Sequence, residues 1–244
     1  MPVVLPAMAS DLLEIFVPIT IITRTIIPLV PGIDQTTSGL LRSYILNRCP
    51  SNILPEKIMD KITLGPMPYM SVMPTLLVGA NVKGKPNYMT AAWATVACMA
   101  PPMLCVAINK TRFTVKGIEE NKTFSLNVPS ATQVVEADHC GLVSGAQEDK
   151  SKVFASFYGK LKTAPLAVEC PVNIECKLFE SVDCGSHLLY IGEVVEIHSD
   201  KSCVADGKPD TAKSDPIVYA QSAYWQVGKQ IDKAFSAGKK YQKK

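Results

Sequence analysis

Two short stretches of the sequence combine residue types that can bind a ligand. The first is residues 87–93, Asn-Tyr-Met-Thr-Ala-Ala-Trp, in which small side chains and a hydroxyl stand beside one large aromatic ring. Small side chains let a planar ligand approach the backbone, whose N–H groups then meet ligand oxygens. Composition alone favours a core strand over a ligand site here, and both interpretations stay open.

The second stretch is residues 109–114, Asn-Lys-Thr-Arg-Phe-Thr, at the predicted start of a helix that runs from residue 112 to about residue 120. Thr111 is the predicted helix cap. Hydroxyls, an arginine and free backbone N–H groups at a helix N-terminus together make an anion site, most naturally for phosphate. A plain capped helix with a solvated arginine is an equally good interpretation.

Other combinations of reactive side chains are weaker candidates. Asp138, His139 and Cys140 are consecutive, so on a helix their side chains diverge and do not form a catalytic or metal-binding cluster. The histidines lack zinc-finger spacing and no C-x-x-C occurs, so no metal site is predicted. Common nucleotide-binding, hydrolase and metalloprotease motifs are also absent from the sequence.

Short apolar runs between turn signals predict the strands that must position these residues. Residues 83–86, Lys-Gly-Lys-Pro, predict a hairpin turn, and the apolar run 103–109 predicts a strand buried on both faces. Many closely spaced strands with inserted helices favour a mainly β, closed or split barrel over a doubly wound sheet. The predicted strands are 76–81, 88–99, 103–109, 123–128, 172–182, 187–198 and 216–220, and the further helices are 132–143, 149–156 and 226–241.

Composition indicates a globular protein with a sizeable core. The chain has 244 residues, 47% hydrophobic and 19% charged, which fits one large domain or one domain with an appendage. Net charge is only +3, but residues 229–244 hold six lysines against Asp232. No basic stripe or recognition motif accompanies this tail, so a solvated tail is favoured over nucleic-acid binding.

Eight cysteines are spread along the chain, several of them inside apolar, strand-like runs. The start of the sequence carries no convincing secretory signal. We therefore expect buried thiols in a reducing cytoplasm, with disulfides in a secreted protein as the alternative.

Residues 1–58 differ in pattern from the remainder. The apolar run 12–30 contains prolines and Arg24, which fits neither a spanning helix of about 20 apolar residues nor a signal peptide. We expect no membrane span, and our hypothesis is that the natural chain begins at or near Met59, with the domain over residues 59–244. An interfacial membrane anchor is the alternative. A native intact mass matching the whole sequence would contradict the hypothesis.

Residues from about 62 to 225 resemble the flavin reductase-like domain family, the FMN-binding split barrel of the flavoredoxin type. Each motif alone is weak, but the ordered set is specific. The matching elements are residues 87–93, 101–103 (Pro-Pro-Met), 112–114 (Arg-Phe-Thr), 124–129 (Phe-Ser-Leu-Asn-Val-Pro), 140–141 (Cys-Gly), His187 with 192–194 (Gly-Glu-Val), and 224–225 (Tyr-Trp).

This resemblance implies a homodimer that binds FMN, with FAD as the alternative, non-covalently near the dimer interface. His187 would lie on the side of the pyridine nucleotide, although a histidine bonded to a neighbouring carbonyl is an equally good interpretation. The implied cofactor-binding residues are Thr90, Ala91, Ala92 and Trp93 against the flavin and its ribityl chain, Asn109, Thr111, Arg112 and Thr114 around the phosphate, and Asn127 close to the ring.

The function that the resemblance implies is an FMN-dependent oxidoreductase of the NAD(P)H:flavin reductase kind. Hydride chemistry then belongs to the flavin, so no side-chain acid–base pair is required. The alternative is a flavoredoxin-like electron carrier that passes electrons between proteins without NAD(P)H and uses its lysine tail to dock an acidic redox partner. A flavin-binding storage or regulatory module is a third hypothesis.

Overall fold

The structure, a computed structural model, describes residues 61–242. The predicted extension over residues 1–58 lies outside the described residues. Every helix and strand described below lies in one compact unit, Pro68–Lys244. The strands are β1 (Met73–Pro74), β2 (Leu76–Val82), β3 (Lys85–Ala91), β4 (Ala94–Cys98), β5 (Met103–Asn109), β6 (Thr123–Val128), β7 (Ser156–Phe157), β8 (Leu166–Ala167), β9 (Val172–Asp183), β10 (His187–Ser199), β11 (Val204–Ala205), β12 (Lys208–Pro209), β13 (Ile217–Ala220) and β14 (Ala223–Gln226). The helices are α3 (Thr114–Asn121), α4 (Val134–Leu142) and α5 (Thr211–Ser214), with 3₁₀ turns η6 (Ala131–Gln133), η7 (Lys150–Lys152), η8 (Lys201–Cys203) and η9 (Ala237–Lys240).

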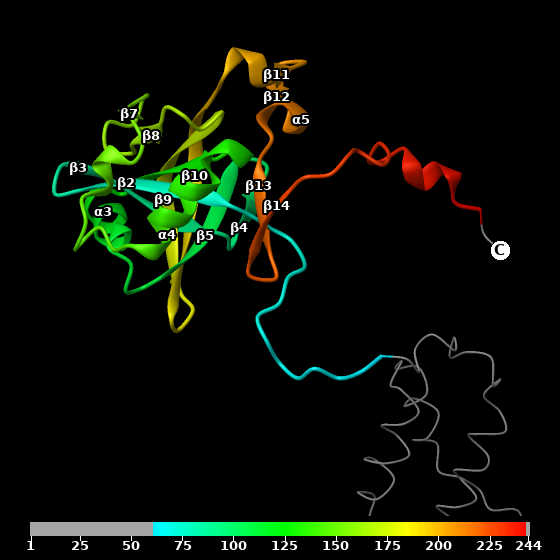
Figure 1. Ribbon diagram of the computed structural model, residues 1–244, viewed down its shortest axis with the longest axis horizontal. Coiled ribbons are helices and arrows are strands. Elements are labelled where there is room, and N and C mark those ends of the chain that lie inside the picture. Colours follow the sequence, from blue (N-terminus) through cyan, green and yellow to red (C-terminus); the bar gives the residue numbers. More distant parts are fainter. Residues whose placement is uncertain (1–60, 243–244) are drawn as a thin grey trace, which may run out of the picture. The chain divides into compact units, whose positions relative to one another are not determined.

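Seven strands form one antiparallel sheet in the order β3-β2-β6-β9-β10-β5-β4. The edge strands β3 and β4 are separated in the chain only by Ala92 and Trp93, so the sheet must curl until its edges meet. The N–H of Ala107 donates to the carbonyl of Trp93 at 2.8 Å, which ties this junction to β5. The result is the barrel seen in Figure 1, and it confirms the predicted mainly β class with inserted helices.

The predicted hairpin between β2 and β3 is confirmed. Val82 pairs with Lys85, which leaves Lys83 and Gly84 as the two turn residues. Both have positive φ, 52° and 76°, as the two-residue turn that matches strand twist requires.

The barrel interior is filled by alternate residues of the strands and by the apolar side of α3. Val78, Val106 and Tyr190 are buried there, and Val115 and Ile118 of α3 pack against the same cluster. Helix α3 therefore closes part of the barrel, which places the start of this helix beside the strands of the site.

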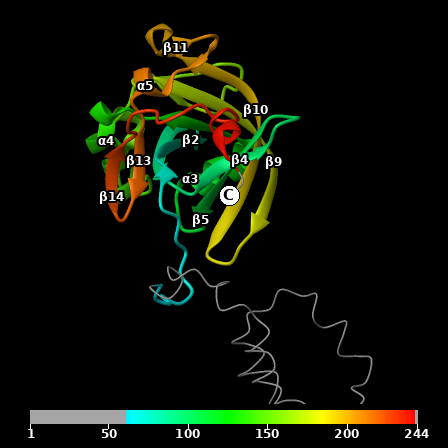
Figure 2. The same cartoon turned by 90° about the vertical axis from the view of Figure 1, so that its right-hand side faces the viewer.

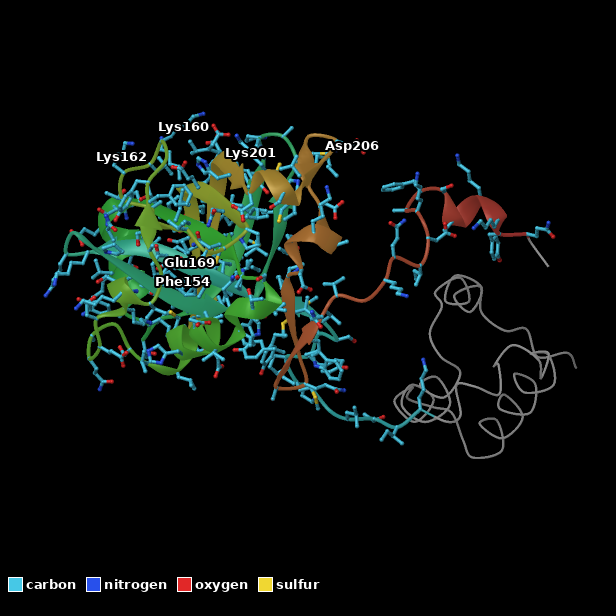
Figure 3. All side chains as sticks on the ribbon, turned by 45° about the horizontal axis from the view of Figure 1, so that its top comes forward. Phe154, Lys160, Lys162, Glu169, Lys201 and Asp206 are labelled. Atoms are coloured by element: carbon cyan, nitrogen blue, oxygen red, sulfur yellow. The ribbon has the colours of Figure 1, made fainter. Side chains whose placement is uncertain are left out.

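A second cluster covers the outer face of β2 and β3. Leu77 and Tyr88 point outward and are buried under Ala137 and Cys140 of α4 and under Phe154. Phe154 is labelled close to Glu169 in Figure 3. The N–H of Ala155, the residue after Phe154, donates a hydrogen bond to the Glu169 carboxylate at 3.0 Å. Because both faces of β2 are covered, every residue of that strand is buried.

A small sheet in the order β1-β13-β14 stands beside the barrel. Figure 2 shows the β13–β14 pair on one side of the molecule and the long strands β9 and β10 on the other. β1 leads directly into β2 through Thr75, whose N–H donates to the carbonyl of Ile217 at 3.3 Å. This sheet supplies a second wall for the site.

Two predicted elements are wrong in extent or type, and a third is wrong only in its burial. The predicted strand 88–99 is two strands, because the chain crosses from one sheet edge to the other at Ala92 and Trp93. The predicted helix 149–156 is only the turn η7, because the chain continues into β7, which pairs with β8. The strand predicted at 103–109 is confirmed as β5, but its predicted burial on both faces is wrong. Val106 and Ile108 are buried on one face, whereas Cys105 and Ala107 on the other face are half-buried.

The predicted helix 226–241 is also wrong. β14 extends to Gln226, and only η9 follows it. Ile231 and Phe235 are 100% and 99% exposed, so no apolar contact supports a helix here. Figure 1 shows this segment, in red, running away from the barrel.

The described cysteines all carry free thiols, and Cys140, Cys170, Cys176 and Cys203 are buried. Within residues 61–242, no helix has both the length and the apolar character needed to cross a membrane.

Candidate functional site

Two adjoining cavities lie between the barrel and α4. The larger has a volume of about 340 Å³ and the smaller about 160 Å³. Met89 and Arg112 line both cavities, so the two cavities adjoin each other. Most of the residues singled out in the sequence lie on their walls.

The smaller cavity lies at the start of α3. That helix begins at Thr114 with Phe113 as its N-cap residue, so the prediction of Thr111 as the cap is wrong. The Thr111 hydroxyl and N–H instead donate to Asn109 Oδ1, at 2.8 and 3.0 Å. Asn109 thereby orders the turn before the helix. Thr111, Arg112 and Thr114 all line this cavity.

Asn87 connects residues 87–93 to residues 109–114 through a hydrogen bond. Its Nδ2 donates to Thr114 Oγ1 at 2.7 Å, and both side chains are buried. Thr114 therefore still has its own hydroxyl proton to donate. Gly145 closes the opposite side of this contact, because a Cβ there would overlap Asn87 Oδ1.

Lys150 is a cavity residue that sequence reasoning missed. Its side chain is only 3% exposed, and its Nζ donates to the carbonyls of Cys140 and Val143 at 3.0 and 3.1 Å. An ammonium group has three protons, so one remains for a ligand. Burial lowers the pKa of Lys150, and nearby Arg112 lowers it further. The sequence carried no signal of this, since a lysine in a predicted surface helix is normally solvated.

Arg112 supplies a second cation. Its Nη1 donates to the carbonyl of Gly141 at 3.0 Å, and the side chain is otherwise exposed. Two cations and several hydroxyl and N–H donors thus surround the smaller cavity, which favours a doubly charged anion such as phosphate.

The larger cavity has a wall of small side chains. Ala91 and Ala92 at the β3–β4 junction and Ala107 of β5 line it, so a flat ligand can lie against the backbone. The rings of Trp93 and His187 stack beside this wall with centroids 4.7 Å apart and planes at 31°. Ser186 Oγ lies 2.8 Å from His187 Nδ1 and holds the imidazole in that position.

Thr90 connects β3 to α4. Its hydroxyl donates to the carbonyl of Ala137, and its Cβ lies 3.2 Å from the position that a Cβ on Gly141 would occupy. Thr90 lines the larger cavity with its hydroxyl already paired. It positions the helix against the strand.

The remaining wall of the larger cavity is polar. Tyr224 Oη donates to Asp138 Oδ1 at 2.7 Å, and Thr75 and Tyr219 lie in the same wall. Burial and then the bond to Asp138 raise the pKa of Tyr224, so its hydroxyl stays protonated and remains the donor. Sequence reasoning did not find this wall, because its members come from three distant segments.

Asn127 does not line either cavity. It is fully buried, and its amide donates to the carbonyl of Leu77 and to Ser125 Oγ, both at 3.0 Å. Its Oδ1 accepts from the N–H of Ala167 and from Asn173 Nδ2, at 3.0 and 2.9 Å. The structure thus places Asn127 in a saturated network that joins strands β2, β6, β8 and β9.

All other predicted site residues meet at the two cavities. Within the part of the chain that the structure describes, no group of His, Cys, Asp and Glu side chains is arranged to hold a metal ion. The cavity residues predicted from the sequence are Thr90, Ala91, Ala92, Trp93, Asn109 and His187 in the larger cavity, Thr111 and Thr114 in the smaller, and Arg112 in both.

Fold and cavities together define a split-barrel protein in which a small cavity lined by Arg112 and Lys150 adjoins a larger cavity with a wall of small side chains. Residues 70–228 match the model of the flavin reductase like domain. This match covers more than half of the chain, and the chain therefore belongs to the flavin reductase like domain family.

Two solved flavoredoxin structures agree with this assignment, and a curated protein of unassigned function is also similar. The chain is 41% identical to flavoredoxin from Methanosarcina acetivorans, with a TM-score of 0.72 over 74% of this chain and 98% of that one. Flavoredoxin of Desulfovibrio vulgaris (Miyazaki F) is 37% identical, with a TM-score of 0.68 over 73% and 99%. An uncharacterized protein of Archaeoglobus fulgidus is 34% identical over 58% of this chain and 80% of that protein. The predicted resemblance and the split-barrel fold are confirmed.

Proposed function

We propose that this protein binds FMN in the two cavities and acts as an NAD(P)H:flavin reductase-like oxidoreductase. The observation that carries the proposal is the small cavity with Arg112 and Lys150, which adjoins a larger cavity with a flat alanine wall. A phosphate fits the first and an isoalloxazine ring the second. We prefer FMN to FAD because the family resemblance implies it, and a smaller cavity of about 160 Å³ suits a single phosphate group.

Each cationic residue has a separate part in this proposal. Arg112 reaches the cavity from an exposed position and presents a planar donor set to phosphate oxygens. Lys150 contributes a buried charge and one remaining N–H donor. Thr114 adds a hydroxyl donor that orients the anion, and Thr111, bonded to Asn109, shapes the turn beside it. Backbone N–H groups at the start of α3 complete the site.

When bound, the flavin supplies hydride and electron chemistry. The chain's own residues bind it, orient it and limit its exposure to water. His187 and Trp93 stand at the edge of the larger cavity, where we place the nicotinamide of NAD(P)H. The His187 ring is held in place by Ser186, so it offers a fixed aromatic face to a second ring.

The second candidate function is electron transfer between proteins without direct use of NAD(P)H. The likeness to two flavoredoxins favours it. The exposed lysines of residues 229–240 would then dock an acidic redox partner. Removing residues 229–244 and finding unchanged transfer rates at low salt would contradict that docking role.

A homodimer is part of the proposal. On the outer face of β5 and β10, Cys105 pairs with Ile191 and Ala107 with Leu189, and all four are half-buried apolar residues. The equivalent outer face of β2 and β3 is covered by α4. An apolar sheet face beside the cavity suits a second copy of the chain. Sedimentation equilibrium tests this, and a monomer at micromolar concentration would contradict it.

The free thiols of the described cysteines suit a reducing compartment, so we propose a cytoplasmic location. Fractionation of cells that produce the protein would test this.

The decisive experiment is an absorption spectrum of the purified full chain, followed by anaerobic addition of NADH and then NADPH. A bound-flavin spectrum that bleaches quickly supports the reductase and names the donor. A spectrum that bleaches only with dithionite supports the electron carrier or, if no redox partner reduces it, a storage module. A colourless protein that takes up no added FMN or FAD would contradict flavin binding.

A further inference from the structure

Thr75 carries a hydroxyl without a partner. The side chain is 1% exposed, and Thr75 Oγ1 makes no hydrogen bond to any of the described residues. Thr75 lies on the wall of the larger cavity, at the start of β2. Buried hydroxyls are almost always hydrogen-bonded, so an isolated one in a cavity wall points to a ligand that completes it.

Asp138 provides the matching acceptor in the same wall. Its Oδ1 accepts the hydrogen bond from Tyr224 at 2.7 Å. No other hydrogen bond to its carboxylate arises within residues 61–242, so Oδ2 is available to a donor. Tyr224 therefore fixes the carboxylate, and the wall offers one hydroxyl donor and one anionic acceptor to whatever lies in the cavity.

Polar and apolar side chains of the larger cavity form separate contacting groups. Tyr224 joins Asp138 and Tyr219 in one polar group, whereas Trp93 and Ala107 contact each other. An isoalloxazine ring has the same asymmetry, because its pyrimidine edge carries carbonyls and an N–H while its other edge is a dimethylbenzene. Placing the pyrimidine edge of the ring against the polar residues of the cavity leaves the fewest hydrogen-bonding groups unpaired.

We propose that Thr75 and Asp138 bind the pyrimidine edge of the flavin. Thr75 donates to a ring carbonyl, Asp138 accepts from the ring N–H, and Tyr224 positions Asp138. This inference rests on the proposed binding of FMN and deepens it by fixing the orientation of the ring. The nearby carboxylate also opposes the negative charge that reduction adds to this end of the ring.

The test uses the full chain and the variants Thr75→Val, Asp138→Asn and Tyr224→Phe, with FMN affinity and midpoint potential as readouts. Glu136→Gln, an exposed carboxylate of the same helix, is the matched control. We expect Thr75→Val to weaken FMN binding about tenfold, as the loss of one buried hydrogen bond predicts. Its flavin-free form should be no less heat-stable than the wild type, since a methyl replaces an unpaired hydroxyl. Asp138→Asn should shift the potential of bound FMN to a less negative value, and Glu136→Gln should not.

Several results would overturn the inference. If the wild type binds FMN but Thr75→Val and Asp138→Asn leave affinity and potential unchanged, the ring edge lies elsewhere while the proposed function stands. If Thr75→Val alters only the KM for NAD(P)H, the wall serves the pyridine nucleotide instead. If the wild type binds no flavin, the proposed function itself fails. Should Asp138→Asn fold poorly, Tyr224→Phe must still change the FMN affinity or the potential for the inference to hold.

Discussion

Lys150 and Arg112 donate hydrogen bonds to the carbonyls of consecutive residues, Cys140 and Gly141, both at 3.0 Å. These carbonyls lie at the C-terminal end of α4, which is the negative end of the helix dipole. The helix thus holds two cations at the wall of the small cavity, where their mutual repulsion would otherwise separate them. An anion bound there gains charge neutralisation from both.

Replacing Arg112 by Gln should weaken FMN binding about 10- to 100-fold, the effect of losing a charge-assisted hydrogen bond. Stability should change little, because the side chain is exposed. Fluorescence quenching of FMN measures the affinity. Lys116→Gln, an exposed cation of α3, is the control and should bind normally. Equal FMN affinities of the wild type and Arg112→Gln would show that Arg112 does not contribute to FMN binding.

Replacing Lys150 by Met should weaken FMN binding and also destabilise the fold. The carbonyls of Cys140 and Val143 would lose their donor inside the protein, at a cost of about 1–3 kcal/mol. Urea denaturation of the flavin-free protein measures the second effect. Lys152→Met, on the exposed side of η7, should show neither change. A variant that loses stability but binds FMN with full affinity would make Lys150 purely structural.

Replacing Gly145 by Ala should disturb the small cavity through Asn87. The new Cβ would overlap Asn87 Oδ1 and come within 2.8 Å of Phe113 Cδ1, so Asn87 must release Thr114 or the loop must move. We expect a loss of about 1–3 kcal/mol in unfolding free energy, as overpacking produces, together with weaker FMN binding. Gly228→Ala is the control, since nothing lies within 4 Å of its Cβ position. Unchanged stability of Gly145→Ala would show that the loop adjusts freely.

Glu175 should make the stability depend on pH. Burial alone would raise its pKa, but hydrogen bonds from His198 and from the N–H groups of Leu161 and Lys160 outweigh burial and lower it. A carboxyl whose pKa is lower in the folded state stabilises the fold above its unfolded pKa of about 4.3. That stabilisation disappears as pH falls through the lower, folded pKa.

The difference in melting temperature between the wild type and Glu175→Gln should therefore shrink as pH is lowered from about 7 to about 3. Differential scanning calorimetry measures it. Glu180→Gln, an exposed change on the same strand, should follow the wild type at every pH. A difference between the wild type and Glu175→Gln that stays constant over this range would mean that the pKa of Glu175 is the same in the folded and unfolded protein.

Thiol reactivity should separate the cysteines by burial. Burial raises the pKa of Cys140 to about 11 and that of Cys176 to about 12, so both should react slowly with a disulfide reagent until the protein unfolds. Exposed Cys184 should react rapidly. The assay uses a Cys49→Ser background, because Cys49 lies outside the described residues. Loss of the rapid phase in Cys184→Ser confirms the assignment, whereas rapid labelling of Cys140 would contradict the burial.

Alternation of apolar residues and turn chemistry were enough to predict most strands. The hairpin at Lys83 and Gly84 follows from local preference, and so do the strands that correspond to β5, β6, β9 and β10. Prediction failed where tertiary contacts override local preference. The predicted helix 226–241 lacks an apolar partner, and the predicted helix 149–156 is replaced by the pairing of β7 with β8.

The residues of the candidate site also fall into those that local sequence predicts and those that only tertiary contacts reveal. Residues 87–93 and 109–114 are chemically distinctive over a few neighbouring positions, so the sequence by itself determined that they could bind a planar, anionic ligand. Lys150 and Thr75 look ordinary in their local context. Only the tertiary structure buries both of them at the cavities, because their function depends on desolvation and on partners far away in the chain. The spacing of residues along the chain does not predict such distant contacts.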